Sequence, residues 1–268
     1  MRAGITLAAG LLLQVCPSTA AADPERVHFD SPDGVWLSGS YHAGRLHRSP
    51  CVLLLHDLGE EQASRSFDPL AKDLHAEGYA VLAFDFRGHG ASRSVEPEEF
   101  WSPMFVNRLL VKGNPRDEEI AFRDFDPRYY SVLVNDIAAA KAWLDGKNDD
   151  RECNSSSLIV MGVGEGAALG AIWANSEWHR HRVRPALAPG LPPRVSSRPE
   201  GSNILCAVWL GISPKLGSRT LDWPALVDVP GRRGKVPMAF LHSSRDRLTK
   251  DLSRKCADRI TAGQKTSY

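Results

Sequence analysis

The stretch SLIVMGVGEGAALGAIW, Ser157 to Trp173, decides the fold. It begins with a continuous apolar run, Leu158 to Met161, of the kind that a parallel sheet buries on both faces. A glycine-rich turn, Gly162 to Gly166, comes next, and small residues follow it up to Trp173. Side chains of this size allow a helix to lie close against a sheet. The stretch therefore predicts a buried strand, a tight turn and a helix.

The rest of the chain repeats this pattern, with apolar strands separated by helical periodicity. Strands are expected at 27–30, 35–42, 51–55, 79–84, 204–211 and 236–242, and helices at 68–78, 131–146 and 248–260. Strands that alternate with helices favour an α/β fold with a doubly wound, mostly parallel sheet. The chain has 268 residues, of which 43% are hydrophobic and 24% are charged, and this suits one large domain with a full core.

The segment at about 93–130 shows no clean period and is predicted to be an insertion in this domain. It mixes prolines with aromatic residues. A structureless loop of this length is uncommon inside a compact domain. The aromatic side chains therefore indicate that the segment packs, as a cover over the ends of the strands.

The first 22 residues have the pattern of a secretory signal peptide. They contain one arginine, an apolar run from Ala3 to Val15 and a cleavage site at Ala20 to Ala22. The apolar run is too short to span a bilayer comfortably, and no later stretch is apolar enough to cross one. The alternatives are a transmembrane anchor and a lipid anchor at Cys16, although Val15 is bulky for a lipid-anchor site. We expect an exported protein, periplasmic or extracellular, whose single domain at 23–268 has no membrane span.

Charge and cysteine usage bear on partners and cofactors. The formal net charge of +1 gives no reason to expect a nucleic-acid partner. No C-x-x-C or H-E-x-x-H pattern supports a metal site, and no cofactor is expected. Removal of the signal leaves four cysteines, namely Cys51, Cys153, Cys206 and Cys256. In an exported protein these predict at least one disulfide, with three possible connectivities, and the alternative is four small buried core residues.

A basic, proline-rich stretch at 179–199 allows two interpretations. It contains five arginines, namely Arg180, Arg182, Arg184, Arg194 and Arg198. Blocks of this kind are usually exposed, which favours a solvated connection. The functional alternative is a surface that binds an anion or a partner.

Four motifs lie where predicted strands end. They are His56-Asp57-Leu58-Gly59, the sequence DFRGHGAS at 85–92, the turn Gly162 to Gly166 and His242-Ser243-Ser244-Arg245-Asp246. In this order they resemble motifs of the α/β-hydrolase superfamily, particularly its serine-aminopeptidase and lysophospholipase-like branch, in which G-x-S-x-G is the nucleophile elbow. The resemblance covers about 27–260. It implies a domain of that fold, with the catalytic groups at the ends of the strands.

This sequence matches the catalytic residues of the superfamily less well than it matches the motifs of the fold. The serine of the elbow is replaced by Gly164, which has no side chain to form an acyl intermediate. Asp246 matches the acid position, but no histidine follows it as the resemblance requires. Residues 265–268 match at most the opening of an eighth strand, so the sheet is expected to lack its last strand. The backbone N–H groups of the oxyanion hole fall to Leu58 and Glu165.

No other residue is expected to replace the missing groups. Glu165 lies one position beyond the nucleophile slot, which suits an acid at a helix N-terminus better than a covalent nucleophile. His56, His89 and His242 match turn residues of the family and are interpreted as structural rather than as bases. Glycine also suits the slot, because the φ > 0 of an elbow costs other residues about 1–3 kcal/mol.

The sequence thus predicts an exported α/β-hydrolase-fold protein that is catalytically inactive and binds an unknown small molecule or protein. The alternative is an active ester- or peptide-type hydrolase of the same superfamily, in which Glu165 or Asp246 activates water. A third interpretation is an unstable remnant, because a seventh strand left as an exposed edge favours aggregation.

Overall fold

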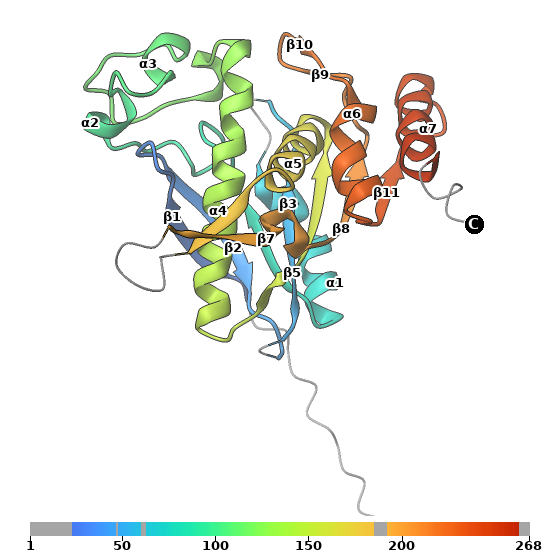
Figure 1. Ribbon diagram of the computed structural model, residues 1–268. Helices are drawn as coiled ribbons and strands as arrows, with labels where there is room; N and C mark the ends of the chain where they lie inside the picture. The colour runs from blue at the N-terminus through green and yellow to red at the C-terminus, as the bar shows by residue number, and fades with distance from the viewer. Residues whose placement is uncertain (1–22, 47, 60–62, 185–191, 263–268) are drawn as a thin grey trace, which may run out of the picture.

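The computed structural model describes residues 23–46, 48–59, 63–184 and 192–262. A seven-stranded sheet forms its centre, in the order β1-β2-β4-β3-β5-β8-β11 (Figure 1). Its strands are β1 (Glu25–Asp30), β2 (Trp36–His42), β3 (Pro50–Leu55), β4 (Ala80–Phe84), β5 (Asn154–Val163), β8 (Ile204–Leu210) and β11 (Met238–Leu241). β2 is antiparallel to β1 and to β4, and the other neighbouring pairs are parallel. The predicted doubly wound, mostly parallel sheet is confirmed. Residues 265–268, expected to open an eighth strand, lie outside the described residues.

Helices cover both faces of the sheet. Four of them, α4 (Val134–Asp149), α5 (Gly164–Glu177), α6 (Trp223–Val227) and α7 (Arg247–Ala262), contribute to the larger core. α1 (Asp68–Ala76) packs on the opposite face, over β3 and β4. The predicted helices are present, with one correction. The helix expected over 131–146 begins later, because the chain first forms the 3₁₀ segment η3 (Pro127–Leu133), and it continues through Gly146 to Asp149.

The central strands are buried on both faces, as their apolar sequences predict. Every residue of β4 is buried, and so is every residue from Cys51 to Leu55 in β3. β3 is hydrogen-bonded to β4 on one side and to β5 on the other, and all three run in the same direction. The motifs that follow these strands therefore meet at one edge of the sheet.

The 93–130 segment packs through its aromatic side chains, as predicted. It forms α2 (Pro97–Phe100), α3 (Asn107–Leu110) and η2 (Phe122–Asp124) and leads into η3. Phe100, Trp101, Phe125 and Tyr129 are buried in the main core. Figure 1 shows α2 and α3 beyond one end of β1, on the side where α4 begins.

Two small hairpins lie outside the central sheet. β6 (His181–Arg184) pairs with β7 (Arg194–Pro199), and β9 (Lys215–Leu216) pairs with β10 (Arg219–Thr220). The first hairpin lies within 179–199, so this basic stretch is more regular than the expected solvated connection. The helical turns η1 (Ser64–Phe67), η4 (Glu200–Asn203) and η5 (Asp228–Arg233) complete the described elements.

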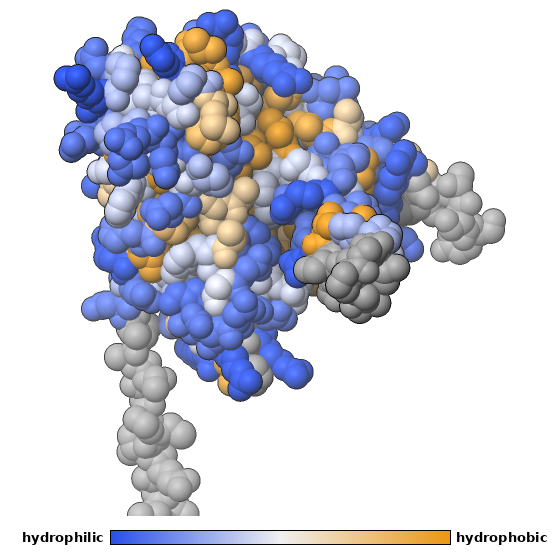
Figure 2. Space-filling view, turned by 60° about the vertical axis from the view of Figure 1, so that its left-hand side comes forward, coloured by the Kyte–Doolittle hydropathy of each residue, from blue (hydrophilic) through white to orange (hydrophobic). Residues whose placement is uncertain are grey.

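The surface bears mainly polar side chains on the face seen in Figure 2, with apolar ones interspersed. Met104 and Leu109, both in the 93–130 segment, are the most exposed large apolar residues. Within the described ranges, no helix has the length and apolar character needed to cross a bilayer. The expected signal peptide at 1–22 lies outside those ranges.

The expected disulfide is not found, because all four cysteines, which lie in the described part of the chain, are free. Cys51 and Cys153 are buried in the main core, where the Cys153 thiol donates to the Leu144 carbonyl oxygen at 3.8 Å. Cys206 pairs in register with Ile159, whose side chain packs against the smaller core on the other face of the sheet. Because side chains alternate between the two faces of a strand, Cys206 lies on the face of the sheet opposite to Cys51 and Cys153.

Candidate functional site

The turn between β5 and α5 is built for close approach of the backbone. Gly164 is the first residue of α5, and its φ of +57° lies in the left-handed region that favours glycine. This confirms the conformation expected for the residue at the centre of an elbow. A Cβ on Gly162 would lie 2.6 Å from the Cα of Ala167, and one on Gly166 would overlap the carbonyl oxygen of His56. The glycines on both sides are therefore required by packing.

The carboxylate of Asp57 fills the space next to Gly164. A Cβ at position 164 would overlap all three atoms of this carboxyl group. Asp57 Oδ1 accepts a hydrogen bond from the Leu58 N–H at 2.9 Å and one from the Glu165 N–H at 2.7 Å. These are the two N–H groups that the resemblance assigns to an oxyanion hole. A side chain of the protein itself thus occupies both the hole and the space of a nucleophile.

Sequence reasoning missed the role of Asp57, although it placed the residue in the His56 to Gly59 motif. The available signal was an acidic residue directly before a predicted oxyanion N–H. A carboxylate at that position can fold back on the N–H of the next residue, which is what Asp57 does with Leu58. The second donor, Glu165, is 108 positions away along the chain and is brought there by the pairing of β3 with β5.

Glu165 carries its carboxylate away from the hole. The Glu165 Oε1 atom accepts a hydrogen bond of 2.7 Å from the Gly217 N–H, in the turn between β9 and β10. Partial burial raises the pKa of Glu165, the Gly217 bond acts against this, and the charge of Asp57 adds to the rise. Glu165 therefore contributes its N–H to the elbow and its side chain to the β9–β10 hairpin.

Asp246 and His242 lie on the exposed surface after β11. The Asp246 carboxylate accepts the Thr249 N–H at 3.1 Å and the Thr249 hydroxyl at 2.5 Å, so it caps the first turn of α7. These bonds lower the pKa of Asp246. Among the described residues no hydrogen bond or ion pair joins Asp246 to the elbow. The family's acid position is filled by a helix cap.

His56 and His89 are buried beside the elbow, and both of their ring nitrogens are engaged. His56 Nδ1 lies 2.6 Å from the Asp57 carbonyl oxygen, and its Nε2 accepts the Phe86 N–H at 3.0 Å. His89 Nδ1 lies 2.9 Å from the Arg87 carbonyl oxygen, and its Nε2 accepts the Gly59 N–H at 3.3 Å. Each ring therefore connects two loops through backbone contacts, which agrees with the structural role expected for both histidines. Within the described ranges, no group of three or more His, Cys, Asp or Glu side chains is arranged to hold a metal ion.

We expect acid to destabilise the protein between about pH 6.5 and pH 4. Burial lowers the pKa of His89 from 6.5 to about 4, and the charge of His56 acts in the same direction. The unfolded chain therefore takes up a proton on His89 at a higher pH than the folded chain does, and protons favour unfolding throughout this range. The stability that neutral His89 contributes is fully present above pH 6.5. About 3 kcal/mol of the unfolding free energy is lost as the pH falls to 4. Urea unfolding at several pH values measures it.

The His89→Gln variant should lose stability at neutral pH and show a shallower decline in this window. His179→Gln, which changes an exposed histidine, is the matched control and should keep the full decline. An unchanged slope in His89→Gln would show that the acid sensitivity arises elsewhere.

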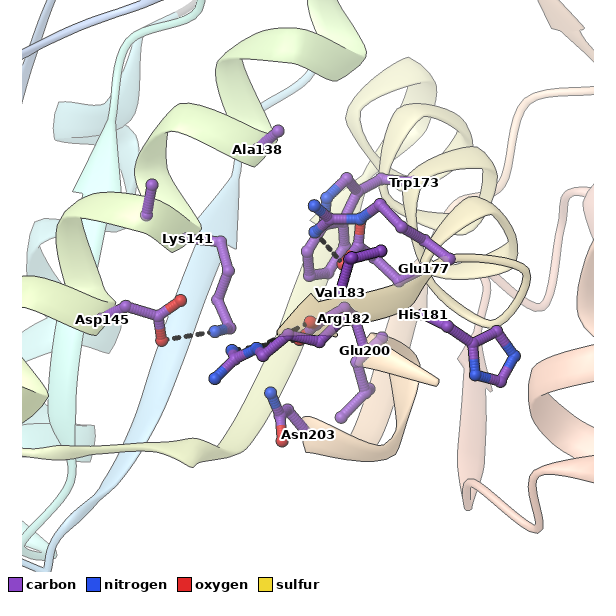
Figure 3. Close-up of a pocket in the computed structure, with 13 residues that line it drawn as sticks. Ala138, Lys141, Asp145, Trp173, Glu177, His181, Arg182, Val183, Glu200 and Asn203 are labelled. Atoms are coloured by element: carbon purple, nitrogen blue, oxygen red, sulfur yellow. Dashed lines mark hydrogen bonds and ion pairs between the residues drawn. The ribbon is translucent and has the colours of Figure 1, made fainter. Parts of the chain in front are cut away.

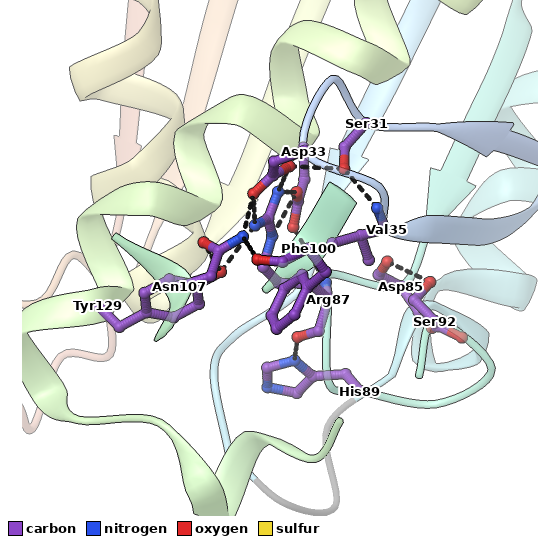
Figure 4. A network of polar contacts seen from close by, with 11 residues as sticks. Ser31, Asp33, Val35, Asp85, Arg87, His89, Ser92, Phe100, Asn107 and Tyr129 are labelled. Atoms are coloured by element: carbon purple, nitrogen blue, oxygen red, sulfur yellow. Dashed lines mark hydrogen bonds and ion pairs between the residues drawn. The ribbon is translucent and has the colours of Figure 1, made fainter. Parts of the chain in front are cut away.

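Arg87 lies at the centre of a buried network that holds the 85–92 turn (Figure 4). Its guanidinium forms ion pairs with Asp33 and Asp136, each at 2.6 Å. It also donates to the Tyr129 hydroxyl at 2.8 Å, which in turn donates to Asn107 Oδ1 at 2.8 Å. Burial raises the pKa of Asp33, but the bonds from Arg87 outweigh this and lower it. The network joins the turn to the β1–β2 connection, the 93–130 segment and α4.

Comparisons with known proteins support the fold. A family model described as serine aminopeptidase, S33, matches residues 47–107, which include the motifs after β3 and β4. An esterase from Pyrococcus furiosus has a similar structure, with 17% identity and a TM-score of 0.56, over 90% of this chain and 78% of the esterase. A second crystal form of that esterase gives a TM-score of 0.55 at 17% identity, with 90% and 77% covered.

An α/β hydrolase from Penicillium sp. sh18 is also 17% identical, but its TM-score is 0.44, and the match covers 71% of this chain and 46% of that one. A search of curated proteins found no match to the sequence. At this level of identity, the likeness to the Pyrococcus esterase shows the fold.

Proposed function

We propose that this chain, a member of the α/β-hydrolase superfamily, is an exported protein that has lost the hydrolytic chemistry of its fold and acts by binding. One observation carries the proposal: Asp57 Oδ1 accepts both N–H groups that would stabilise an oxyanion, at 2.9 and 2.7 Å. Acyl transfer needs a protruding nucleophile, a base and an open oxyanion hole. Gly164 supplies no nucleophilic atom, and Asp57 fills the hole.

The negative charge of Asp57 in the hole also opposes hydrolysis. A substrate carbonyl would have to displace a carboxylate held by two charge-assisted hydrogen bonds, and such bonds are roughly twice as strong as neutral ones. A negative charge left nearby would then repel the oxyanion that forms in the transition state. In an active enzyme, by contrast, the N–H donors of the oxyanion hole are free to bind the negative charge that develops on the substrate oxygen in the transition state.

The histidines beside the elbow do not supply a base. A general base needs a free ring nitrogen within hydrogen-bond reach of the proton that it removes. Both nitrogens of His56 and of His89 are engaged with the backbone. The low pKa of His89, which burial lowers to about 4, further reduces its strength as a base.

Assays of the purified chain test the proposal. We expect no turnover of aryl esters or aminoacyl amides above the rate without protein, together with a cooperative thermal transition that shows a folded chain. The competing hypothesis, an active hydrolase that uses Glu165 or Asp246, is favoured by the raised pKa of Glu165. Turnover that is lost in Glu165→Gln or in Asp246→Asn would establish that alternative and refute the proposal.

Export is tested separately from the loss of chemistry. The proposal expects a mature protein that begins at Asp23, after removal of the predicted signal at 1–22. Expression of the full chain in a host with a secretion pathway, followed by N-terminal sequencing, gives the answer. An uncleaved N-terminus in the cytoplasm would refute export while leaving the argument from Asp57 intact.

A further inference from the structure

A pocket of about 430 Å³ lies between α4, α5 and β6 (Figure 3). Its walls come from the middle of α4, at 138–145, from the C-terminal half of α5, from β6 and from the start of β8. Because α5 leads back from the carboxyl end of β5, and Ile204 is the first residue of β8, the pocket lies toward the amino ends of the strands, away from the elbow. Figure 3 shows Lys141 of α4 and Trp173 of α5 on facing walls. The volume falls in the range of small-molecule sites.

Each carboxylate in the pocket is already engaged by a cation. Glu177 accepts two hydrogen bonds from Arg180, at 3.0 and 2.6 Å. Glu200 likewise accepts two from Arg182, at 3.0 and 3.3 Å. Asp145 accepts from Lys141 at 2.6 Å and from the Ser155 hydroxyl at 2.5 Å. The acidic side chains therefore leave little acceptor capacity for a ligand.

Donors remain available in the same pocket. The Lys141 ammonium has three N–H donors, and Asp145 is its one acceptor among the described residues, although the side chain is only 10% exposed. Trp173 is 2% exposed, and its indole Nε1 has no hydrogen-bond partner in the described part of the chain. A buried donor without an acceptor costs about 1–3 kcal/mol. Trp173 Nε1 is a donor of this kind, and the Lys141 ammonium keeps N–H groups beyond the one that Asp145 accepts, so the pocket offers donors to the acceptor atoms of a ligand.

We propose that this pocket binds a small molecule that carries a carboxylate or a phosphate group beside an apolar portion. The anionic oxygens accept from Lys141 and from Trp173 Nε1, which supply the deep donors. Arg180 and Arg182 also line the pocket, with side chains 62% and 56% exposed, and each is paired with a glutamate. Ala138, Ala142 and Ile204 give the apolar wall.

Calorimetric titration of the mature chain with three aromatic probes tests this site. Phenylphosphate and benzoate carry the two candidate anions, and benzyl alcohol is the neutral comparison. We expect one of the anions to bind at least about tenfold more tightly than the alcohol, because charge-assisted hydrogen bonds are replaced by neutral ones. The tighter anion identifies which group the pocket takes. Equal affinity for the alcohol, or no binding of either anion at millimolar concentration, would overturn the proposal.

Variants locate the binding. Lys141→Met should weaken the anion about tenfold or more. Lys147→Met is the matched control, because Lys147 lies on the same helix and pairs with Glu152 outside the pocket, and it should leave the affinity unchanged. Equal affinity in Lys141→Met and the unsubstituted chain would place the ligand elsewhere and refute the assignment.

A spectroscopic measurement tests the site even if the Lys141→Met variant does not fold. In the unsubstituted protein, the indole N–H resonance of Trp173, identified by its loss in Trp173→Phe, should shift as the anion is added. No shift at saturation would exclude Trp173 from the site. The Asp57→Asn variant should bind the anion normally, because the elbow lies at the other end of the sheet. The anion-binding test can therefore fail or succeed regardless of whether the elbow is catalytically inactive.

Discussion

Replacing Gly164 by serine restores the motif G-x-S-x-G, and we expect the variant to be both inactive and less stable. The new Cβ would overlap the Asp57 carboxylate, and serine would have to adopt a φ of +57°. Strain in this region and overpacking together should cost about 2–4 kcal/mol of unfolding free energy. No hydrolysis should appear, because neither His56 nor His89 has a free ring nitrogen to activate the hydroxyl. Denaturant unfolding and an aryl-ester assay measure the two effects.

The control for this substitution is Gly146→Ser. Gly146 lies inside α4 with no atom within 4 Å of an added Cβ, so stability should change little. In the double variant Asp57→Ala, Gly164→Ser, the overlap is removed, and part of the lost stability should return although turnover does not. Clear turnover by either serine variant would show that a base is present and would contradict the argument.

Replacing Arg87 by methionine should produce the largest loss of stability, about 3–5 kcal/mol. Methionine fills much of the space but leaves Asp33 and Asp136 as buried carboxylates without their cation. An unpaired buried charge costs far more than a lost surface pair. Arg128→Met is the matched control: its ion pair with Asp126 is on the surface, with side chains 69% and 36% exposed, and its loss should not change the unfolding midpoint.

Tyr129→Phe tests the same network if the Arg87 variant does not fold. It removes only the hydroxyl that accepts from Arg87 and donates to Asn107, and should cost about 1–2 kcal/mol. A midpoint unchanged in both Arg87→Met and Tyr129→Phe would show that the network does not stabilise the turn.

Much of the fold was predictable because local patterns and tertiary structure agree. The apolar run at 51–55 is a central strand, and Gly78 follows α1 with a φ of +97°. The conformation of Gly164 was predictable for the same reason, since the turn requires it. The start of α4 was not, because the 3₁₀ segment before it owes its position to the buried Tyr129 and Leu133.

The decisive contact of the site depends on pairing across the sheet. The motif around Asp57 and the one around Gly164 were each found in the sequence, but which side chain fills the space between them depends on the loop after β3. The same holds for the pocket between α4 and α5, where the packing of the two helices places Lys141 and Trp173 on facing walls. Sequence patterns identify such residues on single helices, strands and turns, but they do not show which of these residues lie side by side in the folded protein.

The occupied hole also bears on how this protein could change over evolutionary time. A working hydrolase keeps backbone donors unpaired between catalytic cycles and accepts a less stable resting state in exchange for rate. Here Asp57 satisfies those donors permanently. Selection on this chain can therefore favour rigidity at the elbow without opposing turnover, and a return to catalysis would have to begin with the loss of a side chain.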